Sequence, residues 1–549
     1  MYFLKQCISV LQILVLLLMI SSCKFRQKIS MVLHNGVIYT ADKNFAIQEA
    51  VAINDGKIVA TGTSAEILRR FEADSSINLQ GKPVFPGFID AHCHFTGYAT
   101  DLWKCDITGT TSFDEILTKL KQYAATNHTA WIYGRGWDQN DWQVKEFPDK
   151  KILDSLYPQQ PVFLKRVDGH AALVNQRALD ITGITINSKI AGGTIEVKNG
   201  KLTGILVDNA MDLVEAKIPP IADSLAQQYY LQAQQTCFAY GLTGVHDCGV
   251  SEHTLAMVEE AQKAGRLKMK IFALLTDSAH YYQKWIANGV YKTPLLHVGG
   301  FKVYADGALG SRGACLLQPY TDKPDWSGFL LSNTAHFKQL AQALAASNLQ
   351  MCTHAIGDSG NRQILSVYKE VLKTGNNRRW RIEHAQVVNQ NDIDFFGQYN
   401  IIPSVQPTHA TSDMYWAVNR LGAQRIQGAY AYQSLLQQNG WLPLGTDFPV
   451  EDINPFKTFY AAVQRKDAKG YPATGFQPQQ ALTRKQALLG MTLWAAKAAF
   501  EENEKGSIEA GKAADFIILD TDLMLAPANQ LLQTKVLATF VNGQKLYSY

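Results

Sequence analysis

The first candidates for chemistry in this sequence of 549 residues are two histidines separated by a single residue. His92 and His94 follow the apolar segment 86–91, which is predicted to be a β-strand. Because residues i and i+2 of a strand face the same side, both imidazoles would point in one direction. Two neutral imidazole nitrogens on one face can bind a divalent metal ion. Such a pair also arises by chance, so its meaning depends on further ligands elsewhere in the chain.

Four further ionisable residues stand within or directly after other apolar segments. Lys302 lies inside the segment 299–305, where an unpaired ammonium would cost much free energy. The other three follow predicted strands and are His354, His384 and Asp447. Together with the histidine pair they form an ordered set of six ligand-type residues, for which chance is a poor explanation.

Eight short apolar segments divide the middle of the chain and alternate with amphipathic stretches. They lie near 84–92, 243–247, 270–275, 299–305, 350–354, 380–384, 401–405 and 441–446. This alternation predicts eight strand–helix units and therefore an α/β fold with a (β/α)8 TIM barrel. Active sites of such barrels lie at the carboxyl ends of the strands, which is where the six residues fall.

The remaining segments predict additions to this barrel, which would occupy residues 85–505. The gap between the first two apolar segments is far longer than a normal crossover, so we expect an insertion at about 130–235. Residues 31–84 and 506–549 both show strands with tight turns, including a hairpin signal at 54–57. They predict one β-sandwich domain that is built from both chain ends.

Residues 1–22 have the features of a secretory signal peptide, because Lys5 precedes the apolar stretch Ile8–Ile20. The sequence Ile20-Ser21-Ser22-Cys23 resembles a bacterial lipobox, in which the cysteine is lipidated and becomes the mature N-terminus. We therefore expect an exported bacterial lipoprotein, anchored to a membrane through Cys23 and a tether at 23–30, on the periplasmic or cell-surface side. The alternatives are an uncleaved anchor or an ordinary signal peptide followed by a chance cysteine.

Composition excludes several other classes of protein. With 46% hydrophobic residues, the chain can bury enough apolar surface to fold, unlike a disordered or fibrous protein. The net charge of +4 is too small and too dispersed for nucleic-acid binding. No internal run reaches 18 apolar residues, which excludes a polytopic membrane protein. The six cysteines after Cys23 form no CxxC pair and predict no disulfide framework.

Four longer motifs, at 301–312, 353–358, 406–410 and 445–449, are similar to those of the exoenzyme-type amidohydrolase family 3. That family includes YtcJ-like proteins and N-substituted formamide deformylases. The segment 506–515 is also typical of it, and the resemblance covers essentially everything after the tether. The resemblance implies a metal-dependent hydrolase that cuts a C–N bond, of the amide or N-substituted formamide type, in a small-molecule substrate.

The resemblance also implies a ligand set, with two divalent ions that we expect to be zinc. His92, His94 and Asp447 would bind the more buried ion, and His354 and His384 would bind the other. The remaining member of the set, the lysine at position 302, would be carboxylated on Nζ and bridge both ions. The alternative is an unmodified Lys302 that pairs with Asp306 in a one-metal site.

The expected mechanism follows from charge. Divalent metal ions lower the pKa of bound water from about 16 to about 7, so that hydroxide forms at neutral pH. Asp447 would accept the proton of this hydroxide as general base and pass it to the leaving nitrogen as general acid. The weaker candidates for substrate binding are His170, Arg312 and His409. Local hydrogen bonding or loop orientation is the alternative role of each.

Two other functions compete with this interpretation. One is deamination of a heterocycle by a one-metal relative. Lys302 argues against this function, because a one-metal site does not need a lysine that could bridge two ions. The other is a non-catalytic surface lipoprotein that binds a small molecule. The complete set of metal-ligand residues argues against this function. The number of divalent ions per chain distinguishes these functions, because about two, one or none would be found. The sequence names no substrate and leaves homo-oligomerisation open.

The lipobox predicts the chemistry of the mature N-terminus. Mass spectrometry of the native protein should find a lipid-modified Cys23, and Cys23→Ala should block the processing. Recovery of a soluble mature protein with an unmodified Cys23 would contradict the prediction.

Overall fold

The computed structural model describes residues 26–549 of the chain. The predicted signal peptide at 1–22 and Cys23 lie outside the described residues. Within the described part, no helix is both long enough and apolar enough to cross a membrane.

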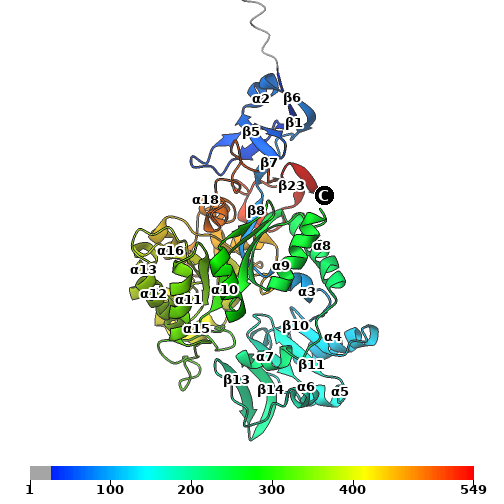
Figure 1. Cartoon of the computed structure of the whole chain (residues 1–549), viewed down its shortest axis with the longest axis vertical. Coiled ribbons are helices and arrows are strands. Elements are labelled where there is room, and N and C mark those ends of the chain that lie inside the picture. The colour runs from blue at the N-terminus through cyan, green and yellow to red at the C-terminus, as the bar shows by residue number, and fades with distance from the viewer. Residues whose placement is uncertain (1–25) are drawn as a thin grey trace, which may run out of the picture.

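A parallel sheet that follows the order of the chain forms the centre of the molecule (Figure 1). Its strands are β8 (Phe88–Cys93), β15 (Leu242–Val250), β16 (Lys270–Thr276), β18 (Leu296–Tyr304), β19 (Gln350–Ala355), β20 (Arg381–His384) and β21 (Ile402–Ser404). All neighbouring strands in this order are parallel. The α/β fold with a TIM-type barrel that the sequence predicted is therefore confirmed.

The segment 441–446, predicted as the eighth strand, closes the barrel without being a regular strand. Leu444 makes an isolated parallel bridge with Val405 on one side. On the other side, the Ala91 N–H donates a hydrogen bond of 3.1 Å to the Leu444 carbonyl. Pro443 has no N–H to donate, which limits the ladder at this point. The prediction of a strand was wrong here, but the segment occupies the expected place between the last and first strands.

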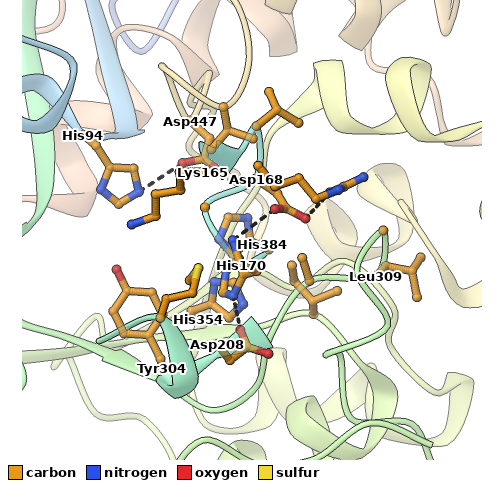
Figure 2. Close-up of a pocket in the computed structure, with 18 of the residues that line it drawn as sticks. His94, Lys165, Asp168, His170, Asp208, Tyr304, Leu309, His354, His384 and Asp447 are labelled. Atoms are coloured by element: carbon orange, nitrogen blue, oxygen red, sulfur yellow. Dashed lines mark hydrogen bonds and ion pairs between the residues drawn. The ribbon is translucent and has the colours of Figure 1, made fainter. Parts of the chain in front are cut away.

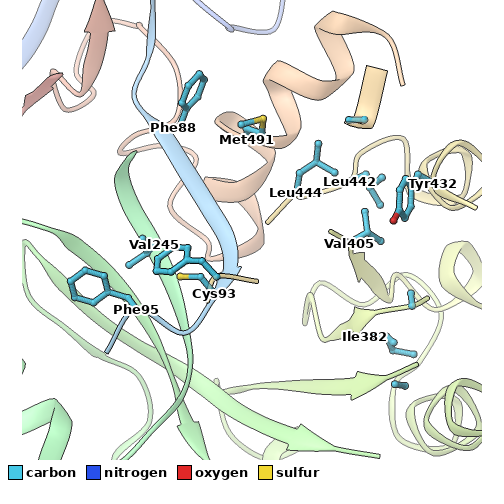
Figure 3. Close-up of a cluster of buried hydrophobic side chains, with 14 of the residues drawn as sticks. Phe88, Cys93, Phe95, Val245, Ile382, Val405, Tyr432, Leu442, Leu444 and Met491 are labelled. Carbon is cyan, nitrogen blue, oxygen red and sulfur yellow. The ribbon is translucent and has the colours of Figure 1, made fainter. Parts of the chain in front are cut away.

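Helices surround the barrel and bury its outer face. They are α8 (Asp223–Ala239), α9 (Glu252–Lys263), α10 (Ala279–Asn288), α11 (Thr334–Ala345), α12 (Asp358–Val371), α13 (Asp394–Gln398), α14 (Pro407–Asp413), α15 (Ala417–Arg425), α16 (Tyr432–Asn439), α17 (Pro455–Gln464), α18 (Arg484–Gly490) and α19 (Leu493–Ala498). In α12 the buried residues include Ile364, Leu365 and Tyr368, which lie on one face at helical spacing. Figure 3 shows part of the resulting core, with Phe88 and Leu444 among its members.

A separate sheet lies between β8 and β15 in the sequence, at the end of the molecule opposite to the N-terminal strands (Figure 1). Its strands are β9 (Cys105–Asp106), β10 (Ile132–Trp137), β11 (Val162–Arg166), β12 (Ala171–Val174), β13 (Gly193–Lys198) and β14 (Lys201–Asp208). The helices of this region are α3 (Phe95–Asp101), α4 (Phe113–Thr126), α5 (Lys151–Leu156), α6 (Gln176–Thr182) and α7 (Asn209–Glu215). We refer to residues 105–215 as the insertion. It has hydrophobic clusters of its own, which contain Trp137 and Phe163.

Strands from both chain ends share one sheet, in the order β24-β23-β22-β7-β2-β3. These strands are β2 (Val37–Tyr39), β3 (Ile47–Gln48), β7 (Pro83–Pro86), β22 (Phe516–Leu519), β23 (Val536–Val541) and β24 (Gln544–Ser548). A second sheet contains β1 (Gln27–His34), β4 (Ala50–Asn54), β5 (Lys57–Gly62) and β6 (Phe71–Asn78), with α2 (Ser64–Arg70) beside it. A buried ion pair of 2.6 Å between Lys270 Nζ of β16 and Asp515 Oδ2 joins the shared sheet to the barrel.

Candidate metal centre and cavity

The predicted ligand residues meet at the carboxyl ends of the barrel strands. His92 lies in β8, Lys302 in β18 and His354 in β19, whereas His384 ends β20 and Asp447 follows the closing segment. One ligand atom each from His92, His384 and Asp447 lie within 4.8 Å of one another, and all three residues are buried. Parallel strands place their carboxyl ends on one side of a barrel, so residues far apart in the sequence come together there.

Asp447 is the residue on which the others converge. Its Oδ1 lies 3.5 Å from His92 Nε2 and 3.3 Å from His94 Nε2. Its Oδ2 lies 3.6 Å from His409 Nε2. Asp447 and His384 have φ angles of 65° and 72°, in the left-handed region that non-glycine residues rarely adopt. Such conformations cost free energy and cluster at functional sites.

The unsatisfied atoms of this cluster fit a metal ion. Among the residues that the structure describes, Asp447 Oδ1 and His384 Nδ1 are buried and have no hydrogen-bond partner. A buried polar atom without a partner is costly and calls for an explanation. Carboxylate oxygens and imidazole nitrogens are ligands that zinc and similar ions accept in proteins. A divalent cation between these residues would satisfy the unpaired atoms.

The protonation states of the cluster are those that metal binding requires. Burial lowers the pKa of His92 to about 4 and lowers the pKa of His354 and His384 well below the usual value. Burial alone would raise the pKa of Asp447, but the nearby imidazoles of His94, His92 and His384 outweigh it and hold this pKa well below its usual range. Neutral imidazoles and an ionised carboxylate are the forms that bind metal.

A cavity of about 680 Å³ lies over the cluster and is lined by both the barrel and the insertion (Figure 2). The barrel contributes His94, Lys302, His354, His384, His409 and Asp447. The insertion contributes Arg135, Lys165, Asp168, His170 and Asp208. The candidate metal centre therefore faces a partly open cavity that is large enough for a small molecule.

Comparison with known proteins matches residues 76–547 to the family model described as the Amidohydrolase family. The chain belongs to this family. The Arabidopsis thaliana protein LONG AFTER FAR-RED 3 is 33% identical, with 93% of this chain and 91% of the relative covered. YtcJ of Bacillus subtilis is 30% identical, with 94% and 98% covered. The N-substituted formamide deformylase of Arthrobacter pascens is 25% identical, with 93% and 97% covered.

The fold of this amidohydrolase also resembles solved structures. A crystal structure of an uncharacterized metal-dependent hydrolase from Pyrococcus horikoshii has a TM-score of 0.75 and 28% sequence identity. The match covers 91% of this chain and 99% of that one. The family and this neighbour together support a hydrolase that depends on a divalent metal.

Lys302 of the amidohydrolase is fully buried, and no described carboxylate lies within ion-pair distance of it. Its Nζ is 3.2 Å from His92 Nε2 and 4.8 Å from the centre of the Tyr304 ring. Asp306, the alternative partner that the sequence offered, is engaged elsewhere. Its carboxylate accepts hydrogen bonds from the backbone N–H groups of Cys315, Ile356 and Gly357. Burial lowers the pKa of Lys302, but Tyr304, Cys248, Glu383 and Asp447 outweigh burial and raise this pKa. An unmodified Lys302 would therefore be a buried cation that is compensated only by groups beyond ion-pair distance.

Behind His92 lies a buried chain of charges that the sequence analysis missed. Glu383 Oε2 is 2.5 Å from His92 Nδ1, and Glu383 Oε1 is 2.7 Å from Arg381 Nε. Burial opposes ionisation, but Arg381 and His92 hold the pKa of Glu383 at about 2. Such a carboxylate fixes the tautomer of a ligand histidine and turns its Nε2 toward the metal. The signal in the sequence was two opposite charges, two positions apart, within an apolar strand.

The three predicted substrate-binding residues are placed differently. His170 and His409 line the cavity. Arg312 is not among the residues that line it, because its Nη2 pairs with Asp322 Oδ2 at 2.9 Å. The guanidinium of Arg312 thus pairs with a carboxylate ten positions later in the chain. The structure does not place Arg312 at the candidate metal centre.

Glu383→Gln should weaken metal binding by about 10- to 100-fold, because the amide no longer fixes the His92 tautomer as an anion does. Metal affinity is measured by competition with a chelator, and circular dichroism checks the fold. Glu370→Gln, which removes an exposed partner of Lys338, is the matched control and should leave affinity unchanged. Wild-type affinity in Glu383→Gln would show that this carboxylate does not support the metal centre.

Proposed function

We propose that this amidohydrolase hydrolyses the C–N bond of an N-substituted amide, with N-substituted formamides as the leading substrate class. The observation that carries the proposal is the convergence of His92, His384 and Asp447, with unpaired buried atoms, beside a cavity. The similarity to an N-substituted formamide deformylase over 93% of the chain supports the substrate class.

The proposal assigns two zinc ions to the site. His92, His94 and Asp447 would hold one ion, and His354 and His384 the other. Lys302 would be carboxylated and would bridge both. The environment of Lys302 supports this assignment, because a carbamate would replace a buried cation that has no described anionic partner. Its new negative charge would also offset part of the charge that two divalent ions bring into the barrel.

The residues of the chain would then have distinct tasks. When bound, the ions supply activated water and polarise the substrate carbonyl. Asp447 is ionised and has an unpaired oxygen, so it can accept the proton of the attacking water. It then returns this proton to the nitrogen, which leaves as an amine. His409, with Nε2 at 3.6 Å from Asp447 Oδ2, would orient this carboxylate.

The lipobox supports a further proposal on location. The mature protein would be held at a membrane through lipidated Cys23, on the periplasmic or cell-surface side. The described residues begin three positions later. Residues of the insertion line part of the cavity. The insertion lies at the end of the molecule away from β1 (Figure 1), so substrate could enter away from the anchored end.

A substrate screen tests the function. Signal-free protein is loaded with zinc and assayed against formamides, N-acyl amines and cyclic amides, with elemental analysis of the same sample. We expect release of formate and an amine, with about two ions per chain. One ion together with release of ammonia from a heterocycle would instead identify a deaminase. Absence of turnover together with absence of bound metal would identify a binding protein.

Two substitutions separate the roles of Lys302 and Asp447. Lys302→Ala should lose most activity, and short carboxylic acids should partly restore it by supplying the bridging oxygens. Asp447→Asn should lose about 10²- to 10⁴-fold in turnover and should not be rescued, because a proton acceptor is missing. Initial rates and metal content of both variants are measured together. Full activity of Lys302→Ala with two bound ions, or near wild-type turnover of Asp447→Asn, would contradict the respective role.

A further inference from the structure

His170 and Asp208 form a hydrogen-bonded pair at the wall of the cavity that the mechanism above does not use. His170 Nδ1 lies 2.6 Å from Asp208 Oδ1, and both residues belong to the insertion (Figure 2). The Asp208 side chain is fully buried, whereas the His170 side chain keeps 13% of its surface exposed to the cavity. A carboxylate can only accept a hydrogen bond, so the pair places the proton on Nδ1 of His170. Burial lowers the pKa of His170, but Asp208, Asp168 and Asp306 outweigh burial and raise this pKa. Above that pKa the ring is neutral, and its Nε2 atom is left as an acceptor.

The backbone conformation of Asp208 is unfavourable, which indicates that the pairing with His170 is maintained at a cost in free energy. Its φ angle is 52°, in the left-handed region that is unfavourable for a residue with a side chain. The other oxygen, Oδ2, is buried without a hydrogen-bond partner among the described residues. It sits against two glycines of the barrel loop after β18, and a Cβ at Gly307 or Gly313 would lie 2.4 Å from it. The barrel therefore leaves room for a carboxylate that the insertion supplies.

The loop that carries His170 is held by contacts other than the Asp208 carboxylate, among them a hydrogen bond of 3.0 Å from the Asp208 backbone N–H to the His170 carbonyl. The His170 N–H donates a hydrogen bond of 3.0 Å to Asp168 Oδ1. Asp168 and Asp138 both pair with the buried guanidinium of Arg166, whose Nε donates to Gln139 at 2.9 Å. With the backbone anchored in this way, the remaining freedom of His170 is the orientation of its ring, which Asp208 sets.

The position of the ring decides which substrate atom it meets. The centroids of the His170 and His354 rings are 5.0 Å apart, so His170 stands at the edge of the candidate metal centre where the scissile bond must lie. An amide presents a carbonyl oxygen, which needs donors or a cation, and an N–H group, which needs an acceptor. Because Nε2 is an acceptor, the N–H group is its complement.

We propose that His170, oriented by Asp208, accepts a hydrogen bond from the N–H group of the scissile amide and thereby selects amides that carry one substituent on nitrogen. This inference rests on the proposed function and narrows its substrate class. Asp208 is a positioning residue, and His170 is the residue that touches the substrate. The insertion would thus supply the contact that recognises the leaving nitrogen, while the barrel supplies the metal ligands.

The test compares two substrates that differ only in this hydrogen atom. N-Butylformamide has the N–H group, and N-butyl-N-methylformamide has a methyl group in its place. The kcat/KM of the zinc-loaded full chain is measured for both substrates in wild type and in His170→Ala. Loss of the acceptor should lower the value for N-butylformamide by about 10- to 100-fold and change that for the N-methyl compound by less than about threefold. Metal content and thermal unfolding are measured on each sample.

Asp208→Asn tests the positioning role with the same substrates. An asparagine can present its NH₂ group to Nδ1, which moves the ring proton to Nε2 and turns the acceptor into a donor. The preference for N-butylformamide should collapse as in His170→Ala, with metal content retained. Asp114→Asn is the matched control, because Asp114 also belongs to the insertion, is exposed, makes no ion pair among the described residues and does not line the cavity. It should leave the preference within about twofold of wild type.

The outcomes separate this inference from the proposed function. Equal losses on both substrates in His170→Ala would overturn the inference and leave the function standing, as would an unchanged preference in Asp208→Asn. If the metal-loaded wild type cleaves neither formamide, the proposed function fails and the inference fails with it. A loss confined to the N–H substrate, with metal and stability unchanged, supports both.

Discussion

The barrel interior must hold several charges in a space from which water is largely excluded, and most features of the site follow from this constraint. Lys302, Arg381, Glu383 and Asp447 all lie almost entirely out of solvent. A buried charge is tolerated only where an opposite charge or a set of hydrogen bonds compensates it. Arg381 and Glu383 compensate each other, and Asp306 is compensated by three backbone N–H groups. Lys302 and Asp447 remain, and they are the two residues that face the cavity.

The same constraint explains how far the sequence could be interpreted. Charged residues at the ends of apolar strands are conspicuous, so the histidines, Lys302 and Asp447 could be placed from strand order alone. The eighth strand was misjudged because hydrophobicity marks a buried segment, whereas Pro443 and its missing N–H decide whether a ladder forms. Arg312 does not line the cavity, and strand order could not show this, because it gives the position of a backbone but not the countercharge, Asp322, toward which a long side chain turns.

Contacts between side chains that are far apart in the sequence could not be predicted, for a different reason. Glu383 could have been noticed, since it stands beside His384 and two positions after Arg381 in a strand that is buried throughout. Asp208 could not, because nothing near it in the chain indicates that it meets His170, 38 positions away, or the glycines of a barrel loop. The first contact depends on the register between β12 and β14 within the insertion. The second depends on how the insertion packs against the barrel, because the insertion has hydrophobic clusters of its own. Because the insertion and the barrel have separate cores, the residues of the insertion that line the cavity can change while the barrel retains its metal ligands.

The sheet shared by both chain ends has a consequence for the order in which the molecule can be assembled. Phe85 of β7 pairs with Ile517 of β22, more than 400 positions later. During synthesis, β7 therefore lacks its second neighbouring strand, β22, until almost the whole chain has left the ribosome. Closing so long a loop is slow. An unpaired strand invites association with other chains, but Pro83 and Pro86 bound β7 and lack N–H groups that an intruding strand could use. The two prolines would thus protect the unpaired edge of β7 until β22 has been synthesised.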